Sequence, residues 1–312
     1  MSDLPLQGSC SGYEIRSGIR FRTLRGAGGG LPLRVREAEE LAPVGELIAE
    51  WEPRPGNPFH GRLLRIGRAF AFWASDAGWY VVDPDEPSVT LAATGDGPTL
   101  TGEVRMFGVP SSLIALERGD LSMHAAAVEI AGKAVVLAGP SRYGKTTLAA
   151  AFAAAGHRLL TEDMTRCTLL GGASVFPGPA VMRLRPDVAE GFRMQTGSQI
   201  VTERERVFVI LGGSLRGSGT PVPLTAILFL RQGSEQLELK AVPTVDAIRD
   251  LWTLTFRLPT DASRAVVFER VTDLIANVPV LNLRRELSLE TLPQVVTLVE
   301  EFVTSGSYRV SS

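Results

Sequence analysis

The segment GPSRYGKT, from Gly139 to Thr146, constrains this 312-residue chain more than any other stretch. It satisfies the pattern G-x-x-x-x-G-K-[ST], follows the apolar run AVVLA and precedes the alanine-rich run TLAAAFAAA. A strand, a glycine loop and a helix in this order make a cradle of backbone N–H groups for phosphate oxygens, at the positive end of the helix. The segment therefore predicts a nucleotide-binding loop rather than a strand–helix turn with an incidental lysine.

The residue types in the loop predict its contacts with ATP. Lys145 is expected to reach the β- and γ-phosphates as a point charge, and the Thr146 hydroxyl is expected to bind Mg²⁺. Lys145 is one of three lysines among 32 basic residues, and the planar fork of arginine would fit this compact position poorly. The remaining nucleotide contacts are expected from the rest of the loop and the next threonine: Gly139, Pro140, Ser141, Arg142, Tyr143, Gly144 and Thr147.

An acidic pair follows the next predicted strand, in the sequence GHRLLTED. Ligands of such folds gather at the carboxyl ends of strands, where Glu162 and Asp163 would lie. Asp163 is the expected general base and Glu162 the expected metal ligand, together with Thr146, although the two carboxylates could exchange roles. The alternative is a solvated acidic turn.

His124 lies in the sequence LSMHAAAVE, one predicted hairpin before the loop. Its position makes it a candidate catalytic residue beside the phosphates. A lone histidine among apolar residues is more often a packed core residue, and the pattern leaves both interpretations open.

The chain divides by pattern into two parts. Residues 1–109 contain short β-branched and aromatic runs separated by Gly, Pro and Asp, which predict a β-rich N-terminal domain. Residues 110–312 predict an α/β domain that contains the loop, with a largely helical final seventy residues. VDAIRDLWTLTF would present one face made of Val245, Ile248, Leu251, Trp252 and Thr255. The segment LGGSLRGSGT, residues 211–220, predicts a flexible linker or a mobile loop.

Composition excludes several classes of function. The formal net charge of −2 favours neither nucleic acid nor an anionic membrane as a partner. No secretory signal and no membrane-spanning segment is expected, and two cysteines are too few for a disulfide framework. These features predict a cytoplasmic protein and leave a homo-oligomer open.

The segment MHAAAVEIAGKAVVLAGPSRYGKTTLAAAFAAAGHRLLTEDM resembles the catalytic domain of HPr kinase/phosphorylase. It resembles more closely the stand-alone HPr kinase-like proteins of peptide-modification pathways such as lasso peptide biosynthesis, as does the following FPGPAVMRLRPD. The resemblance covers about residues 116–190. It implies a P-loop fold related to phosphoenolpyruvate carboxykinase and phosphoryl transfer from ATP to a serine hydroxyl. By position it implies that His124 lies near the phosphates, that Lys145 and Thr146 bind them with Mg²⁺, and that Glu162 and Asp163 supply metal and base functions.

The leading hypothesis is an ATP- and Mg²⁺-dependent kinase for a Ser/Thr hydroxyl of a peptide or protein, such as a ribosomally made precursor peptide. The alternatives are a kinase for a small-molecule hydroxyl and a non-catalytic, nucleotide-binding regulatory module. Selection of the acceptor is expected from residues 1–109 and from the 211–220 loop, where Arg216 could meet an acidic group.

Overall fold

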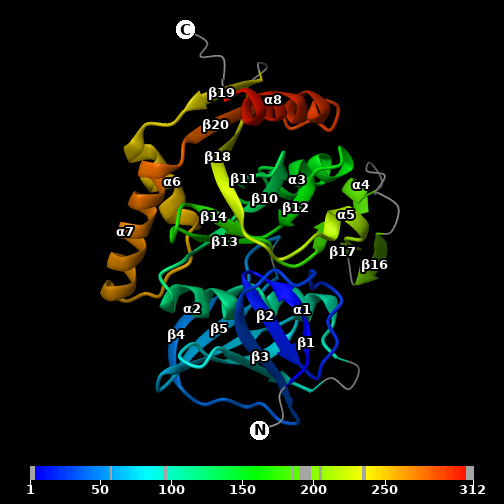
Figure 1. Ribbon diagram of the computed structural model, residues 1–312. Coiled ribbons are helices and arrows are strands. Elements are labelled where there is room, and N and C mark those ends of the chain that lie inside the picture. The colour runs from blue at the N-terminus through cyan, green and yellow to red at the C-terminus, as the bar shows by residue number, and fades with distance from the viewer. Residues whose placement is uncertain are drawn as a thin grey trace.

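The computed structural model shows a mixed α/β protein built on three β-sheets (Figure 1). It describes residues 4–56, 58–93, 97–184, 186–189, 198–203, 206–233 and 237–306. None of the helices in these ranges has the length and apolar character needed to cross a membrane. The α/β class predicted from the sequence is confirmed.

The first sheet contains eight strands from the N-terminal part of the chain, in the order β1-β2-β3-β8-β7-β6-β5-β4. Its strands show the alternation expected of a sheet with one buried face, as in β2, where Tyr13 and Ile15 are buried and Glu14 is partly exposed. β4 lies at one edge and pairs with β5 in antiparallel fashion. The strands are β1 (Leu6–Cys10), β2 (Tyr13–Ser17), β3 (Leu31–Ala38), β4 (Glu46–Trp51), β5 (Gly61–Ile66), β6 (Ala69–Ala74), β7 (Gly78–Asp83) and β8 (Ser88–Ala92).

Two short helices, α1 (Leu100–Met106) and α2 (Val109–Glu117), complete the core of the first sheet. Met106, Phe107 and Ile114 pack in one apolar cluster with side chains of the sheet. The sequence patterns of residues 1–109 indicate a β-rich part and do not indicate α1 within it. This helix spans only seven residues, too few to show a helical period in the sequence, and is fixed at its start by Thr99, whose hydroxyl accepts a hydrogen bond from the Gly102 N–H.

The second sheet has nine strands and carries the predicted loop. The strand order is β12-β10-β11-β18-β14-β13-β9, with β20 beside β18 and β19 beside β20. β11, β18 and β20 run parallel, and β10 forms the expected hairpin with β11. The strands are β9 (Leu121–His124), β10 (Ala126–Ile130), β11 (Lys133–Ala138), β12 (Arg158–Thr161), β13 (Met164–Thr168), β14 (Ser174–Phe176), β18 (Val222–Gln232), β19 (Glu238–Ala241) and β20 (Val280–Arg285).

Helices cover both faces of this second sheet (Figure 1). α3 (Lys145–Ala154) and α8 (Leu292–Ser305) share one apolar cluster with it, and α6 (Thr244–Leu254) and α7 (Asp261–Asn277) share the other. The final seventy residues are not all helical, because the apolar run VPVLNLRR supplies strand β20 between α7 and α8. The predicted face of α6 is also partly wrong: Leu251 is buried, whereas Val245 is 77% exposed.

A third sheet, with the order β15-β17-β16, lies beside the loop-bearing sheet, near α3 and α5. The 211–220 segment forms the short helix α5 and is packed rather than free. Leu215 is only 1% exposed, and the Gly219 N–H donates to the Gly26 carbonyl at 3.0 Å. The expectation of a mobile loop is wrong, because Leu211 and Leu215, each 1% exposed, anchor this glycine- and serine-rich segment. These elements are β15 (Val181–Leu184), α4 (Pro186–Ala189), β16 (Gln199–Glu203), β17 (Arg206–Ile210) and α5 (Gly213–Arg216).

Two buried arginines join the N-terminal sheet to the rest of the chain. Arg25, 2% exposed, donates to the Gly178 carbonyl at 2.7 Å and to the carbonyls of Leu159 and Leu160 at 2.7 and 2.9 Å. Arg166 donates to the Ser11 carbonyl at 2.6 Å, and its guanidinium lies against an aromatic ring of each part. Hydrogen bonds to buried carbonyls are costly to remove, so the two parts are held in a fixed relation.

Candidate active site

The GPSRYGKT segment connects strand β11 to helix α3, which is the local order expected from the sequence. Gly144 has φ +78°, and a Cβ there would lie 2.5 Å from the Arg285 Nη2, so this position requires glycine. Within the described chain no side chain caps the start of α3. The first N–H groups of the helix therefore remain available to an anion at the loop.

Lys145 points back into the loop that precedes it. Its Nζ donates to the carbonyls of Gly139 at 2.8 Å and Pro140 at 3.2 Å, and the residue is 8% exposed. Burial lowers the pKa of the Lys145 ammonium, and the nearby Asp163 and Glu162 oppose that shift. The loop thus holds a positive charge at its centre, beside two carboxylates.

Thr146 and Glu162 meet at the start of α3. The Thr146 hydroxyl donates to the Glu162 Oε1 at 3.1 Å, although the two residues belong to different elements. Glu162 directly follows β12, so the strand delivers its carboxylate to the loop, as the chain order predicts. A hydroxyl and a carboxylate in contact are oxygen ligands of the kind that Mg²⁺ prefers.

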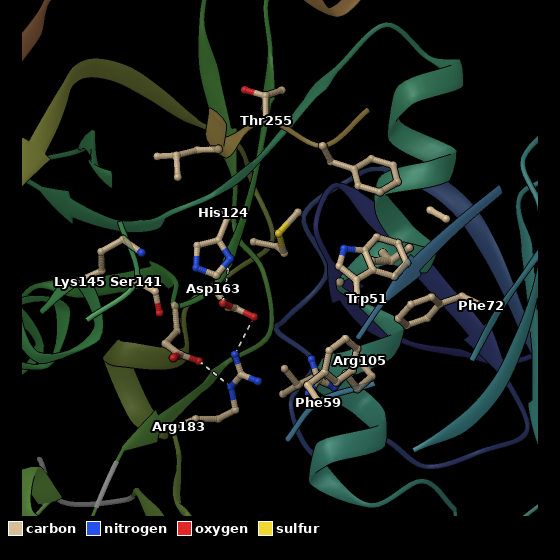
Figure 2. Close-up of a pocket in the computed structure, with 18 of the residues that line it drawn as sticks. Trp51, Phe59, Phe72, Arg105, His124, Ser141, Lys145, Asp163, Arg183 and Thr255 are labelled. Carbon is tan, nitrogen blue, oxygen red and sulfur yellow. Dashed lines mark hydrogen bonds and ion pairs between the residues drawn. The ribbon is translucent and has the colours of Figure 1, made fainter. Parts of the chain in front are cut away.

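Arg183, on β15, binds both members of the acidic pair (Figure 2). Its Nε lies 3.1 Å from Glu162 Oε2 and its Nη2 lies 2.6 Å from Asp163 Oδ2. Burial works against the charge of Asp163, yet Arg183 and then His124 hold the pKa of the Asp163 carboxyl well below its usual range. Burial likewise opposes the charge of Arg183, but the two carboxylates raise the pKa of its guanidinium. Arg183 therefore ties both carboxylates in place, and Asp163 is ionised.

His124, the last residue of β9, lies next to this ion-pair network. Its Nδ1 is 3.7 Å from Asp163 Oδ1, and its side chain is 48% exposed toward the cleft. β9 pairs with β13, which brings His124 opposite Met164 and hence beside the acidic pair. His124 is therefore not a packed core residue, and it lies on a separate strand rather than in the β10–β11 hairpin.

The other predicted loop residues divide between two environments. Several face the cleft with Lys145 and the acidic pair, and Arg142 also donates to the Gly56 carbonyl of the N-terminal part at 3.5 Å. Tyr143 instead packs against the apolar cluster under α3. The loop residues that line the cleft are Ser141, Arg142, Gly144, Lys145, Thr146 and Thr147, whereas Gly139, Pro140 and Tyr143 are not part of its lining.

Two arginines near the loop were not singled out from the sequence. Arg183 interrupts the apolar run AVMRL, and a charged residue at that point of a strand was the available signal. Arg285, at the end of β20, is 3% exposed and lies against the Tyr143 and Gly144 carbonyls at 3.2 and 3.5 Å. Burial lowers the pKa of Arg285, so keeping this side chain charged under the loop costs desolvation free energy.

The cleft beside the loop has a volume of about 1330 Å³ and two unlike walls. The loop, the acidic pair, Arg183 and His124 form one side. The other side comes from the N-terminal sheet and α1, with Trp51, Phe59 and Arg105 pointing toward the ion-pair network (Figure 2). The connection between α6 and α7 also lines the cleft. Segments far apart in the sequence therefore meet at one site.

The residues present fit Mg²⁺ only as part of a nucleotide complex. The described residues contain no group of three or more His, Cys, Asp or Glu side chains that could hold a metal ion. Mg²⁺ in kinase-type sites uses one or two protein ligands and takes the rest from phosphates and water. Thr146 and Glu162 match that requirement, and the buried Lys145 beside an uncapped helix start matches the phosphates.

Comparison with known proteins identifies no family. No family model and no curated protein matches the chain. Among solved structures, the chain is similar to the Hpr(Ser) kinase/phosphatase from Coxiella burnetii, with 13% sequence identity and a TM-score of 0.33. That match covers 59% of this chain and 97% of the other. The residues around the loop, rather than this likeness, carry the functional conclusion.

Proposed function

We propose that the protein is an ATP- and Mg²⁺-dependent kinase that transfers the γ-phosphate to a Ser/Thr hydroxyl of a peptide or protein. The observation that supports this most is the continuous set of contacts at the start of α3. Thr146 contacts Glu162, Arg183 binds both Glu162 and Asp163, and His124 lies beside Asp163. A site that only bound a nucleotide would need one carboxylate, Glu162, for Mg²⁺. It would have no use for a second carboxylate, Asp163, which is more exposed to the cleft.

The loop side of the site is suited to the phosphates of ATP. The N–H groups at the start of α3 would bind phosphate oxygens, and Lys145 would turn from the Gly139 and Pro140 carbonyls to the β- and γ-phosphates. Thr146 and Glu162 would hold Mg²⁺, which would neutralise charge on the transferring group. Arg285 would keep the loop turned, because it binds two of its carbonyls from below.

Asp163 is the residue proposed to accept the proton of the acceptor hydroxyl. As the hydroxyl oxygen bonds to the γ-phosphorus, the bond from that phosphorus to the leaving ADP oxygen breaks and the proton passes to Asp163. Asp163 is ionised and 31% exposed, so it can accept a proton from a group in the cleft, and the ion pair with Arg183 that lowers its pKa also makes it a weaker base. Arg183 fixes the carboxylate, and a positioned base of this kind contributes about 10²–10⁴-fold to a rate. His124, 3.7 Å away, would help to orient it.

A peptide acceptor, including a ribosomally made precursor peptide, is proposed from the sequence resemblance and from the size of the cleft. Single small ligands occupy pockets of about 300–1,000 Å³, and this cleft is larger at about 1330 Å³. It therefore has room for a nucleotide and part of a second substrate.

Nucleotide binding and phosphoryl transfer can be tested with one pair of variants. Lys145→Met removes the charge in the loop, and Lys133→Met removes a lysine whose Nζ donates to the Val303 carbonyl, outside the lining of the cleft. Calorimetric titration with Mg–ATP and transfer from [γ-³²P]ATP to peptides should give binding and transfer in wild type and Lys133→Met, and loss of transfer in Lys145→Met. Equal binding and transfer in all three proteins would contradict the proposal.

A further inference from the structure

We propose that the acceptor is an acidic peptide, bound in extended form between strand β4 and the α6–α7 connection, with one of its carboxylates on Arg257 and Arg264. This inference rests on the proposed kinase function and specifies its acceptor. It follows from three features of the cleft: a pair of cations that lack a buried partner, an apolar wall, and an unpaired sheet edge.

Arg257 and Arg264 both line the cleft. The guanidinium of Arg257 lies 4.0 Å from the ring centre of Trp252, and its Nη1 donates to the Trp252 and Thr255 carbonyls at 2.6 and 2.9 Å. These contacts fix the side chain but leave its charge unbalanced, because no carboxylate of the described residues pairs with it. Burial, and then the nearby charge of Arg264, lower the pKa of Arg257. A carboxylate placed between the two would relieve their repulsion.

Arg264 has only a weak partner of its own. It lies in the first turn of α7, where its Nη1 is 3.3 Å from Asp261 Oδ1 in an exposed pair. Exposed pairs of this kind are weak, so Arg264 is free to exchange partners.

The acidic side chains of the cleft lining are already bound to other cations. Glu50 contacts His60 and Arg62 at 2.8 Å each, and Glu162 and Asp163 contact Arg183. The cations at the α6–α7 connection are thus left for a ligand, and they come from elements other than the phosphate loop. An acidic peptide has the complementary charge.

The opposite wall suits the apolar side chains of a peptide. Trp51 and Phe72 meet edge to face with ring centres 5.9 Å apart, and Phe59 lies under the Arg105 guanidinium at 4.1 Å. Arg105 is held by Asp76 at 2.7 Å, and Arg105 and Asp163 line the same cleft. This wall is therefore close to the proposed base (Figure 2).

The edge of the N-terminal sheet supplies backbone groups for an extended chain. β4 pairs only with β5 among the described strands, and Ile48, Ala49, Glu50 and Trp51 line the cleft. Edge strands offer unpaired N–H and C=O groups, and extended peptides bind such edges by adding a strand. The register shift between Leu47 and Ala49 would limit the added strand to the Trp51 end, next to the aromatic side chains.

The test uses the full chain and a positional scanning library of ten-residue peptides with one fixed Ser or Thr, phosphorylated with [γ-³²P]ATP. The variants are Arg264→Glu, the double variant Arg257→Glu/Arg264→Glu, and Arg249→Glu as the matched control. Arg249 is a 69% exposed arginine on α6 that does not line the cleft. Arg264→Glu changes an exposed pair and keeps the test valid if the double variant does not fold.

Wild type and Arg249→Glu should prefer Asp or Glu at one or two positions of the peptide. Arg264→Glu should lose most of that preference, raise the KM for the preferred peptide about tenfold, leave the KM for ATP unchanged, and accept Arg or Lys at the same position. A preference that persists in Arg264→Glu, or its absence from wild type, would overturn the acidic subsite while leaving the kinase intact. A raised KM for ATP would assign the arginines to the nucleotide instead.

Transfer to small hydroxyl compounds but to no peptide would overturn the peptide acceptor and keep the kinase. Binding of Mg–ATP without transfer to any acceptor, with slow hydrolysis alone, would overturn the proposed function itself.

Discussion

Replacement of Arg183 by methionine tests how the acidic pair is held. Arg183 is 10% exposed at its side chain and lies 3.1 Å from Glu162 and 2.6 Å from Asp163. Methionine keeps much of the volume but leaves two neighbouring carboxylates without their cation. Removing one partner of a buried ion pair costs about 3–5 kcal/mol. Because Asp163 is 31% exposed, solvent screens its interaction with Arg183. We therefore expect the unfolding free energy of Arg183→Met to be lower by about 3 kcal/mol at pH 7.

The pH dependence of that loss gives the sharper result. In wild type the lowered pKa of Asp163 contributes stability that is present above the unfolded pKa, near 3.9, and is lost as pH falls through the lower folded value. In Arg183→Met at least one carboxylate takes up a proton more readily than in the unfolded chain. The difference in unfolding free energy should therefore shrink between pH 7 and pH 4.

The assay is urea unfolding in EDTA at several pH values, so that no divalent ion replaces the missing cation. Arg68→Met is the control, because Arg68 is 86% exposed in its pair with Asp85 and should change stability by less than about 1 kcal/mol. A loss below about 1 kcal/mol in Arg183→Met, or a larger loss that stays constant from pH 7 to pH 4, would refute the reasoning.

Three further outcomes follow from buried groups outside the acidic pair. Arg25→Met should lower the unfolding free energy by about 3 kcal/mol or more in urea titration, because several buried carbonyls lose their donor. A change under about 1 kcal/mol would show that Arg25 does not hold the N-terminal sheet to the rest of the chain. Cys10 and Cys167, whose thiol pKa values burial raises to about 12, should not react with an aromatic disulfide at pH 8 until the chain is unfolded; one fast native thiol would contradict their placement. Arg285→Met should weaken Mg–ATP binding about tenfold in calorimetry while leaving the KM for the peptide unchanged, and equal ATP affinity would remove Arg285 from loop support.

The parts of the site that the sequence predicts are those whose geometry is local. A strand, the glycine loop and a helix follow one another directly, so the positions of Lys145 and Thr146 need no knowledge of the fold. The position of Glu162 can be predicted for the same reason, since one helix and one strand return the chain to the loop. The contact of Arg183 with Glu162 cannot be predicted in this way, because the two residues are 21 positions apart and Arg183 lies on a strand of a different sheet.

The side of the cleft formed by the N-terminal sheet and α1 is still harder to predict from the sequence. Trp51 and Arg105 face the loop because long-range contacts, those of Arg25 and Arg166 among them, fix the N-terminal sheet against the second sheet. Those arginines bind backbone carbonyls, which leave no pattern in the sequence. The packing of the 211–220 segment is hidden from the sequence for a related reason, because its composition is that of a linker while the buried Leu211 and Leu215 anchor it.

The most direct test of the central claim is the single-turnover rate of phosphoryl transfer in Asp163→Asn. Asparagine is nearly isosteric and keeps an oxygen near Arg183, but it cannot accept the proton of the acceptor hydroxyl. With a library peptide that the wild-type protein phosphorylates as substrate, the rate should fall roughly 10²-fold or more, while calorimetry shows Mg–ATP affinity within about threefold of wild type. A rate close to that of wild type would contradict the account, and loss of transfer in Glu162→Gln alone would place the base at Glu162.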